Sequence, residues 1–246
     1  MAFPEEGTNV AAFHDMKWSV PVQPVQPWTG EIRVTSGIVE LNGSLDIPPN
    51  ARGLVLFAHG SGSSRLSPRN RRVAQALQNA GLATLLFDLL TREEEAADAL
   101  NGHLRFDIEF LAARLKVATQ WAARHERVAS LRIGYFGSST GAAAALVAAG
   151  DAPAAIGAVV SRGGRPDLAR DALQRVRAPT LLIVGGEDDV VLPLNEMALA
   201  KLRCAKRLEV VPGATHLFEE PGALEQVSQM AALWFTGHMA HAEVTQ

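Results

Sequence analysis

Ser139, Asp188 and His216 are the residues of this chain whose types and order could together do chemistry. Ser139 lies in the pattern Gly137-x-Ser139-x-Gly141, and the acid and the histidine each follow a run typical of a buried strand. A serine hydroxyl is a weak nucleophile until a nearby histidine takes its proton, and an acid must hold that histidine in the correct tautomer. The order therefore predicts nucleophilic attack by Ser139 on an acyl group.

The pattern around Ser139 is that of a nucleophile elbow, a turn from strand to helix so tight that the serine takes a strained backbone conformation. The run LRIGYF before it predicts a strand, and GAAAALVAA after it predicts a helix. Side chains at Gly137 and Gly141 would collide with the neighbouring helix and strand. We expect the hydroxyl to lie above the sheet edge, at the positive end of that helix. An ordinary N-cap serine is the alternative.

Two adjacent carboxylates, Asp188 and Asp189, could orient the histidine, and we favour Asp188, three residues after Gly185. Asp189 would then be a solvated loop carboxylate or a cap for a helix that starts near Pro193. Alone, His216 would fit a capping or surface histidine as well as a base. The serine and the acid upstream favour the base.

Backbone N–H groups must also stabilise the oxyanion of the transition state. The N–H of Thr140, next to the nucleophile, is one expected donor. The second is expected from the loop HGSGSS, and the best candidate is the N–H of Ser61. His59 in the same loop is expected to be structural and to bond the backbone there.

Four arginines follow strand ends near the predicted site: Arg65, Arg69, Arg162 and Arg165. A guanidinium presents a fork of donors that fits carboxylates and phosphates. One or more of them could bind an anionic group of the substrate. Salt bridges to Asp167 or to the acidic run at 93–95 are the alternative.

The elements that must position these residues alternate between strand and helix. A hairpin is predicted over 31–47, buried strands follow at 53–58, 82–89, 131–136, 156–161 and 180–185, and a last strand is predicted at 207–211. Helices are predicted at 68–80, 106–125 and about 221–235. Repeated β-helix-β units predict a parallel sheet covered on both faces, with ligands outside the carboxyl ends of the strands. Each candidate residue follows such an end.

A single domain is predicted over residues 31–238, preceded by a Pro-containing arm or loose tail at 1–30 and followed by a tail at 239–246. The stretch 162–179 between two strands has room for one small helix. We therefore expect an open site with no large cap domain.

The composition excludes several classes of protein. With 48% hydrophobic and 20% charged residues and a net charge of −3, the chain is typical of a globular protein without a nucleic-acid or membrane partner. The N-terminus lacks a signal-peptide pattern, which predicts a cytoplasmic protein. The sequence does not predict an oligomeric state.

No cofactor or metal is expected, because the chain has no Walker loop, no HExxH motif and a single cysteine. The loop from Gly60 to Arg65 is similar to a dinucleotide fingerprint. However, Arg65 replaces the third glycine, and Asp88 has poor spacing for a ribose-binding acid.

Four stretches carry a resemblance to a known family: FAHGSGSSR, GYFGSSTG, LLIVGGEDDVV and GATHLF. Over residues 31–238 the chain resembles the α/β-hydrolase superfamily, and within it the dienelactone-hydrolase-like branch of small bacterial serine hydrolases. The resemblance implies a three-layer α/β-hydrolase fold with a mostly parallel, twisted sheet of about eight strands and a triad of Ser139, Asp188 and His216. True dienelactone hydrolases have a cysteine at the position of Ser139, so no dienelactone substrate is implied. Cys204 is expected in a helix far from any strand end.

The sequence thus predicts a serine hydrolase that cleaves a small-molecule carboxylic ester or lactone through an acyl-enzyme. An acyltransferase or a thioesterase would use the same triad. A non-catalytic binding protein with a hydrolase fold is the third alternative.

Overall fold

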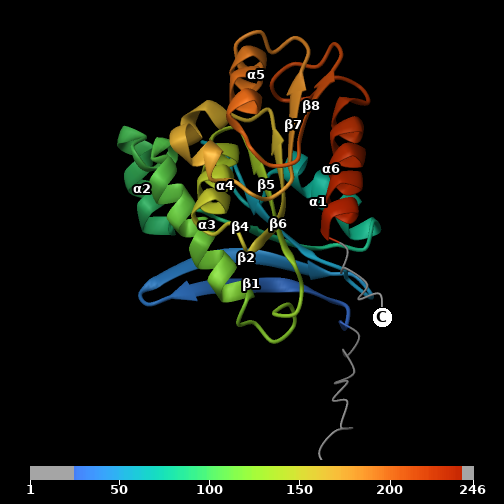
Figure 1. The fold of residues 1–246 in the computed structure, drawn as a ribbon. Helices are drawn as coiled ribbons and strands as arrows, with labels where there is room; N and C mark the ends of the chain where they lie inside the picture. Colours follow the sequence, from blue (N-terminus) through green and yellow to red (C-terminus); the bar gives the residue numbers. More distant parts are fainter. Residues whose placement is uncertain (1–24, 240–246) are drawn as a thin grey trace, which may run out of the picture.

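The computed structural model describes residues 25–239, which form one eight-stranded sheet with helices on both faces (Figure 1). The strands are β1 (Trp28–Ser36), β2 (Val39–Ile47), β3 (Leu54–Ala58), β4 (Ala83–Phe87), β5 (Ile133–Ser138), β6 (Ile156–Arg162), β7 (Thr180–Gly185) and β8 (Lys206–Val211). Their order across the sheet is β1-β2-β4-β3-β5-β6-β7-β8. β1 and β2 form an antiparallel hairpin, β2 pairs antiparallel with β4, and the remaining pairs are parallel. The predicted mostly parallel sheet is confirmed.

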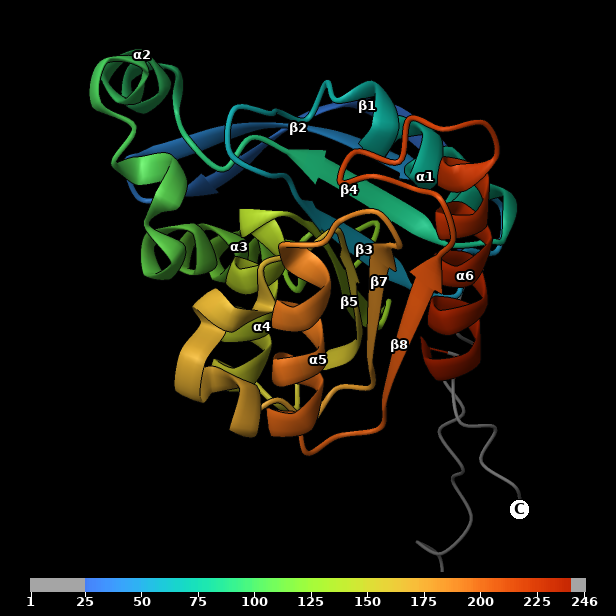
Figure 2. The ribbon, with the colours of Figure 1, turned by 90° about the horizontal axis from the view of Figure 1, so that it is seen from above.

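The helices form one layer on each face of this sheet. They are α1 (Pro68–Asn79), α2 (Arg92–Asn101), α3 (Ile108–Ala122), α4 (Thr140–Asp151), α5 (Val191–Lys201) and α6 (Ala223–Met239), with 3-10 segments η1 (Leu104–Phe106) and η2 (Pro166–Gln174). Figure 2 shows α1 and α6 on one side of the sheet and α3, α4 and α5 on the other. Each layer closes its own cluster of buried apolar side chains against the sheet. The short η2 is the only segment between β6 and β7, as expected for a fold without a large cap.

The five central parallel strands are apolar because helices cover both of their faces. Every residue of β3, β4, β5, β6 and β7 is buried. α4 lies directly behind the nucleophile position, and ten of its eleven buried residues are glycine, alanine, leucine or valine. Small side chains allow this helix to approach the sheet closely, which keeps its N-terminus near the carboxyl edge.

Two domain boundaries differ from the prediction. β1 begins at Trp28, inside the segment expected to be an arm, and its side chain lies under the Arg127 guanidinium at 5.5 Å from the ring centroid. Met239, expected in the tail, ends α6 and packs against the positions of Gly53 and Gly134 at the amino edge of the sheet. Hydrogen bonding in the hairpin and apolar packing extend both elements. Residues 1–24 of the predicted arm, including Trp18, and residues 240–246 of the predicted tail lie outside the described residues.

Two further local differences follow from capping. The helix predicted from Phe106 begins at Ile108, because the Asp107 side chain accepts the Phe110 N–H and caps the helix there. The sequence analysis also missed α2, although Thr91 and Glu94 form a capping box at its start. That Thr-x-x-Glu spacing was the signal that could have found it.

The prediction that Cys204 lies in a helix is wrong. The residue lies in the short connection between α5 and β8. This connection lies at the amino end of β8, so Cys204 is indeed away from the carboxyl edge. Among the described residues, no helix combines the length and apolar character needed to cross a bilayer.

Candidate active site

Ser139 lies at the strained turn between β5 and α4, with φ 50° and ψ −122°. The two flanking glycines allow this turn, as predicted. A Cβ at Gly137 would lie 2.4 Å from the Ala142 Cα, and a Cβ at Gly141 would lie 2.1 Å from the Ala58 carbonyl oxygen. Because both contacts are with backbone atoms, no side chain larger than hydrogen fits. This tight turn places Ser139 at the carboxyl edge of the sheet.

His216 and Asp188 form a hydrogen-bonded pair on neighbouring loops. The His216 Nδ1 lies 2.7 Å from the Asp188 Oδ2. Asp188 is only 9% exposed, whereas Asp189 points to solvent and caps no helix. The structure thus brings the favoured acid to the histidine and leaves Asp189 as an exposed loop carboxylate. With Nδ1–H donating to the carboxylate, His216 presents Nε2 as its free acceptor.

The end of β6 brings Ser139 and His216 to the same place. The Ser139 N–H donates to the Arg162 carbonyl at 3.3 Å. The next residue, Gly163, has φ 51°, and a Cβ there would lie 3.0 Å from the His216 carbonyl oxygen and 3.6 Å from Cε1 of its ring. No hydrogen bond joins the Ser139 hydroxyl to His216 in this structure. In serine hydrolases without substrate this contact is commonly loose and tightens in the complex.

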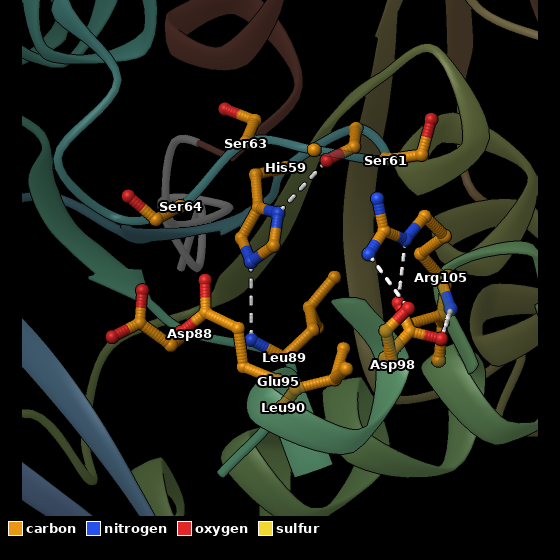
Figure 3. A pocket seen from close by; sticks show the side chains of 13 residues that line it. His59, Ser61, Ser63, Ser64, Asp88, Leu89, Leu90, Glu95, Asp98 and Arg105 are labelled. Carbon is orange, nitrogen blue, oxygen red and sulfur yellow. Dashed lines mark hydrogen bonds and ion pairs between the residues drawn. The ribbon is translucent and has the colours of Figure 1, made fainter. Parts of the chain in front are cut away.

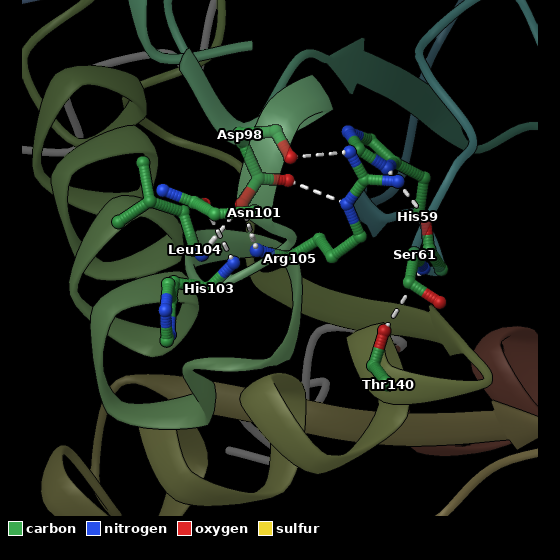
Figure 4. A network of polar contacts seen from close by, with 9 residues as sticks. His59, Ser61, Asp98, Asn101, His103, Leu104, Arg105 and Thr140 are labelled. Atoms are coloured by element: carbon green, nitrogen blue, oxygen red, sulfur yellow. Dashed lines mark hydrogen bonds and ion pairs between the residues drawn. The ribbon is translucent and has the colours of Figure 1, made fainter.

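The loop after β3 packs directly against the nucleophile. A Cβ at Gly60 would lie 3.0 Å from the Ser139 Cβ. The Ser61 N–H, expected to be an oxyanion donor, instead donates to the Thr140 Oγ1 at 3.0 Å (Figure 4). The Thr140 N–H lies at the first position of α4, where helix geometry supplies no intrahelical partner. The two predicted donor residues therefore meet beside Ser139, but only one of their N–H groups is free.

His59 holds this loop in place through both ring nitrogens. Nδ1 donates to the Gly60 carbonyl at 3.0 Å, and Nε2 accepts the Leu89 N–H at 3.1 Å (Figure 3). Burial lowers the pKa of His59 below its ordinary value, so the ring is neutral. The expected structural role fits these contacts.

Three of the four predicted arginines pair with carboxylates: Arg65 with Glu31, Arg69 with Glu219 and Arg165 with Asp167. The last pair is the salt bridge that stood as the alternative to substrate binding. Arg65 additionally approaches Asp88, whose Oδ1 accepts the Arg65 N–H at 2.8 Å. These guanidinium groups are thus engaged by the protein itself.

Arg162 differs from the other three. It is 7% exposed, and its guanidinium meets the Asn70 amide oxygen at 3.3 Å and lies 5.8 Å from the Phe218 ring centroid. Its Nε has no hydrogen-bond partner, and no carboxylate among residues 25–239 pairs with it. Burial, together with the nearby Arg69 charge, lowers the pKa of Arg162 to about 10. It is a buried cation on the residue whose backbone carbonyl accepts the Ser139 N–H.

A pocket opens from the loop that carries Ser61 (Figure 3). Serine hydroxyls of the loop form one wall, and the rest is formed by leucines and acidic side chains from the segment after β4, from α2 and from α3, together with Arg105 of η1. It is lined by His59, Gly60, Ser61, Gly62, Ser63, Ser64, Asp88, Leu89, Leu90, Glu95, Asp98, Arg105 and Leu111. Two of its lining residues, Gly60 and Ser61, also lie next to Ser139 and Thr140, whereas Ser139, Asp188 and His216 themselves do not line it.

The Asp98–Arg105 pair in this pocket was not predicted from the sequence. Arg105 Nε donates to Asp98 Oδ2 at 2.5 Å, and its guanidinium lies toward His59 and Ser61 (Figure 4). Burial would raise the pKa of Asp98, but the Arg105 guanidinium and the Leu104 and Arg105 N–H groups outweigh it and hold that pKa below its usual value. Neither residue follows a strand end, so no sequence signal marked them.

The chain belongs to the dienelactone hydrolase family, whose model matches residues 41–236. The structure is similar to that of a dienelactone hydrolase from Anabaena variabilis, with a TM-score of 0.85 and 59% identity over 87% of this chain and 99% of that one. It also resembles Est1E from Butyrivibrio proteoclasticus, with a TM-score of 0.72 and 17% identity over 85% of this chain and 99% of that one. The second likeness concerns the fold alone, and together they confirm the predicted α/β-hydrolase fold.

A curated relative carries a different name. A putative phosphoribosyl transferase of Mycobacterium tuberculosis is 59% identical over 209 residues, which are 85% of this chain and 46% of that protein. The chain thus spans about half the length of the curated relatives that it matches at this identity. Among the described residues, no group of three or more histidine, cysteine or acidic side chains could hold a metal ion.

Proposed function

We propose that this protein is a serine hydrolase that cleaves a carboxylic ester or a lactone through an acyl-enzyme. The observation that carries the proposal is the His216–Asp188 pair beside a strained Ser139. A tight-turn serine has little structural use, since the strain costs about 1–3 kcal/mol. Membership of a hydrolase family supports the same chemistry.

In the proposed mechanism, His216 Nε2 takes the Ser139 proton as Oγ attacks the carbonyl carbon. Asp188 holds the ring and stabilises the imidazolium. The Thr140 N–H stabilises the oxyanion, aided by the positive end of α4. His216 then gives its proton to the leaving alcohol, and a water activated by the same nitrogen hydrolyses the acyl-enzyme. These steps need no cofactor.

The test is labelling with a fluorophosphonate probe, followed by peptide mapping. We expect the modification at Ser139 and none in Ser139→Ala, with hydrolysis of at least one substrate in a screen of esters, lactones and thioesters. His216→Ala should also abolish turnover while the protein stays folded. A folded wild-type protein that takes no label would contradict the proposal and favour the non-catalytic alternative.

Transfer of the acyl group to another acceptor is the second candidate, because hydrolysis and transfer share the acyl-enzyme. Adding alcohol or thiol acceptors to the labelled-substrate assay separates the two, since only a transferase would convert the acyl group to the acceptor's ester in preference to the acid.

We also assign a charged group to the substrate, with Arg162 as the residue that would bind it. It is the one predicted arginine with no carboxylate partner among residues 25–239. A buried guanidinium is costly without a compensating anion. An anionic substrate group near the end of β6 would supply that compensation.

A further inference from the structure

The contact between Ser61 and Thr140 leaves the expected oxyanion site incomplete. The Ser61 N–H has one hydrogen to donate, and in this structure it donates it to the Thr140 Oγ1 at 3.0 Å. Thr140 is 5% exposed, so its side chain is fixed by packing and does not rotate freely in solvent. A substrate oxyanion therefore finds the Thr140 N–H but not a free Ser61 N–H.

The Thr140 hydroxyl has a donor of its own that the protein does not use. A hydroxyl accepts through its lone pairs and donates one hydrogen. Its oxygen accepts from Ser61, whereas no group of residues 25–239 accepts its hydrogen. A hydroxyl that accepts a hydrogen bond is also a stronger donor, because the two bonds polarise one another in a medium of low dielectric constant.

The location of this hydroxyl fits the missing donor. Thr140 directly follows Ser139, and a Cβ at Gly60, in the loop that carries Ser61, would lie 3.0 Å from the Ser139 Cβ. Gly60 and Ser61 also line the pocket described above. A carbonyl oxygen bonded to the carbon attacked by Ser139 would thus meet both polar hydrogens of one residue.

We infer that the Thr140 side-chain hydroxyl is a catalytic residue that donates the second hydrogen bond to the oxyanion, with the Ser61 N–H supporting it from behind. The inference rests on the proposed function. As Ser139 Oγ bonds to the carbonyl carbon, the carbonyl π pair moves to oxygen, and the Ser139 proton goes to His216. Thr140 keeps its proton throughout and returns to its starting state when the alcohol leaves.

A different arrangement makes the opposite prediction. If Thr140 only blocked the site, its side chain would have to move away and release the Ser61 N–H before reaction. Removing the hydroxyl would then free that N–H and would raise activity or leave it unchanged.

The experiment compares Thr140→Val, Thr140→Ala and Thr140→Ser with the wild type. Valine keeps the shape of the side chain and removes the hydroxyl. Alanine also removes the hydroxyl and serves as a second variant if the valine protein does not fold. Serine keeps the hydroxyl and removes only the methyl group. Thr236→Val is the matched control, because the Thr236 hydroxyl bonds only carbonyls of its own helix near the opposite edge of the sheet. Each variant is assayed on the ester found in the screen and on its thionoester, in which C=S replaces C=O.

The expected result is a loss of kcat on the ester by about 10²–10³-fold in Thr140→Val and Thr140→Ala. Thr140→Ser should recover most of it, and Thr236→Val should match the wild type. Because sulfur is a weak acceptor, the thionoester should lose less, and the ratio of ester to thionoester rates should fall. Circular dichroism and thermal unfolding confirm that each variant is folded.

Two outcomes would overturn the inference while leaving the serine hydrolase intact. One is a folded Thr140→Val protein with unchanged or higher kcat. The other is an equal loss on ester and thionoester, which is expected of a residue that only holds the loop. Failure of the proposed function looks different, because the wild type itself would then neither label at Ser139 nor turn over any ester.

Discussion

The His216 imidazole and the Asp188 carboxylate are joined by a 2.7 Å contact between Nδ1 and Oδ2. The two residues come from different loops, after β8 and β7, which are adjacent and parallel in the sheet. Asp188 is buried, and the turn around it is held by its own backbone, with its carbonyl accepting the Val191 and Leu192 N–H groups. The carboxylate is therefore fixed before any substrate arrives.

Asp188→Asn should lower kcat by about 10⁴-fold, because an amide no longer selects the tautomer with a free Nε2 or stabilises the imidazolium. Asp189→Asn should leave kcat within about twofold, since that side chain is exposed and touches no part of the site. Steady-state kinetics on one ester measures both. A larger effect at Asp189 would mean that the acid is wrongly assigned.

Gly141→Ala should unfold more easily and lose Ser139 labelling, because the new Cβ would lie 2.1 Å from the Ala58 carbonyl oxygen. We expect the free energy of unfolding to fall by about 3 kcal/mol. The matched variant is Gly237→Ala, on an exposed turn of α6 with nothing within 4 Å. At that position alanine should raise the free energy of unfolding by about 0.5–1 kcal/mol, because alanine favours the helix more than glycine does. Urea unfolding measures both, and equal effects would contradict the steric argument.

Stability should fall on acidification as the pH drops below about 6.5, the ordinary pKa of histidine. His59 has a lowered pKa in the folded state, so between that value and 6.5 only the unfolded chain takes up its proton. Its contribution is complete above pH 6.5 and is lost as the pH falls toward the folded pKa, with a slope of up to about 1.4 kcal/mol per pH unit. The physical cause is burial of the ring, whose Nε2 is already occupied by the Leu89 N–H.

Unfolding in urea at pH 7.5, 6.5 and 5.5 tests this slope, with His59→Gln as the comparison. The variant should be less stable at pH 7.5 and less sensitive to pH. The lowered pKa of His125 affects both proteins equally, so the difference isolates His59. Parallel pH profiles would show that His59 is not the group responsible.

Arg162→Met should lower kcat/KM on esters that carry a carboxylate by more than on neutral esters of the same size. A lost ion pair in a site of low dielectric constant corresponds to about 10–100-fold in favour of the neutral substrate. Methionine fills much of the space beneath the Phe218 ring. Thermal unfolding serves as the control for folding, and an equal loss on both esters would rule out the charge role.

Much of this protein could be predicted from local patterns in the sequence. Buried parallel strands are apolar runs, and the Gly-x-Ser-x-Gly pattern marks the tight turn at Ser139. Gly137 is required by contact with the nearby Ala142, whereas Gly141 is required by contact with Ala58 on β3. The fold class, the elbow and the loop after β3 were therefore predictable. Helix ends were less so, because the caps at Asp107 and Thr91 are single side chains in otherwise ordinary stretches.

Only the tertiary structure decided which polar groups meet across the carboxyl edge of the sheet. Asp188 and Asp189 are neighbours in sequence, and the loop geometry alone turns one toward His216 and the other to solvent. The Ser61 N–H and the Thr140 hydroxyl are 79 residues apart, so their contact depends on how β3 and β5 pair. The pattern of strands in the sequence predicts the edge of the sheet at which the polar side chains lie. Hydrogen bonds between groups distant in sequence depend instead on strand register and packing, which no local pattern predicts.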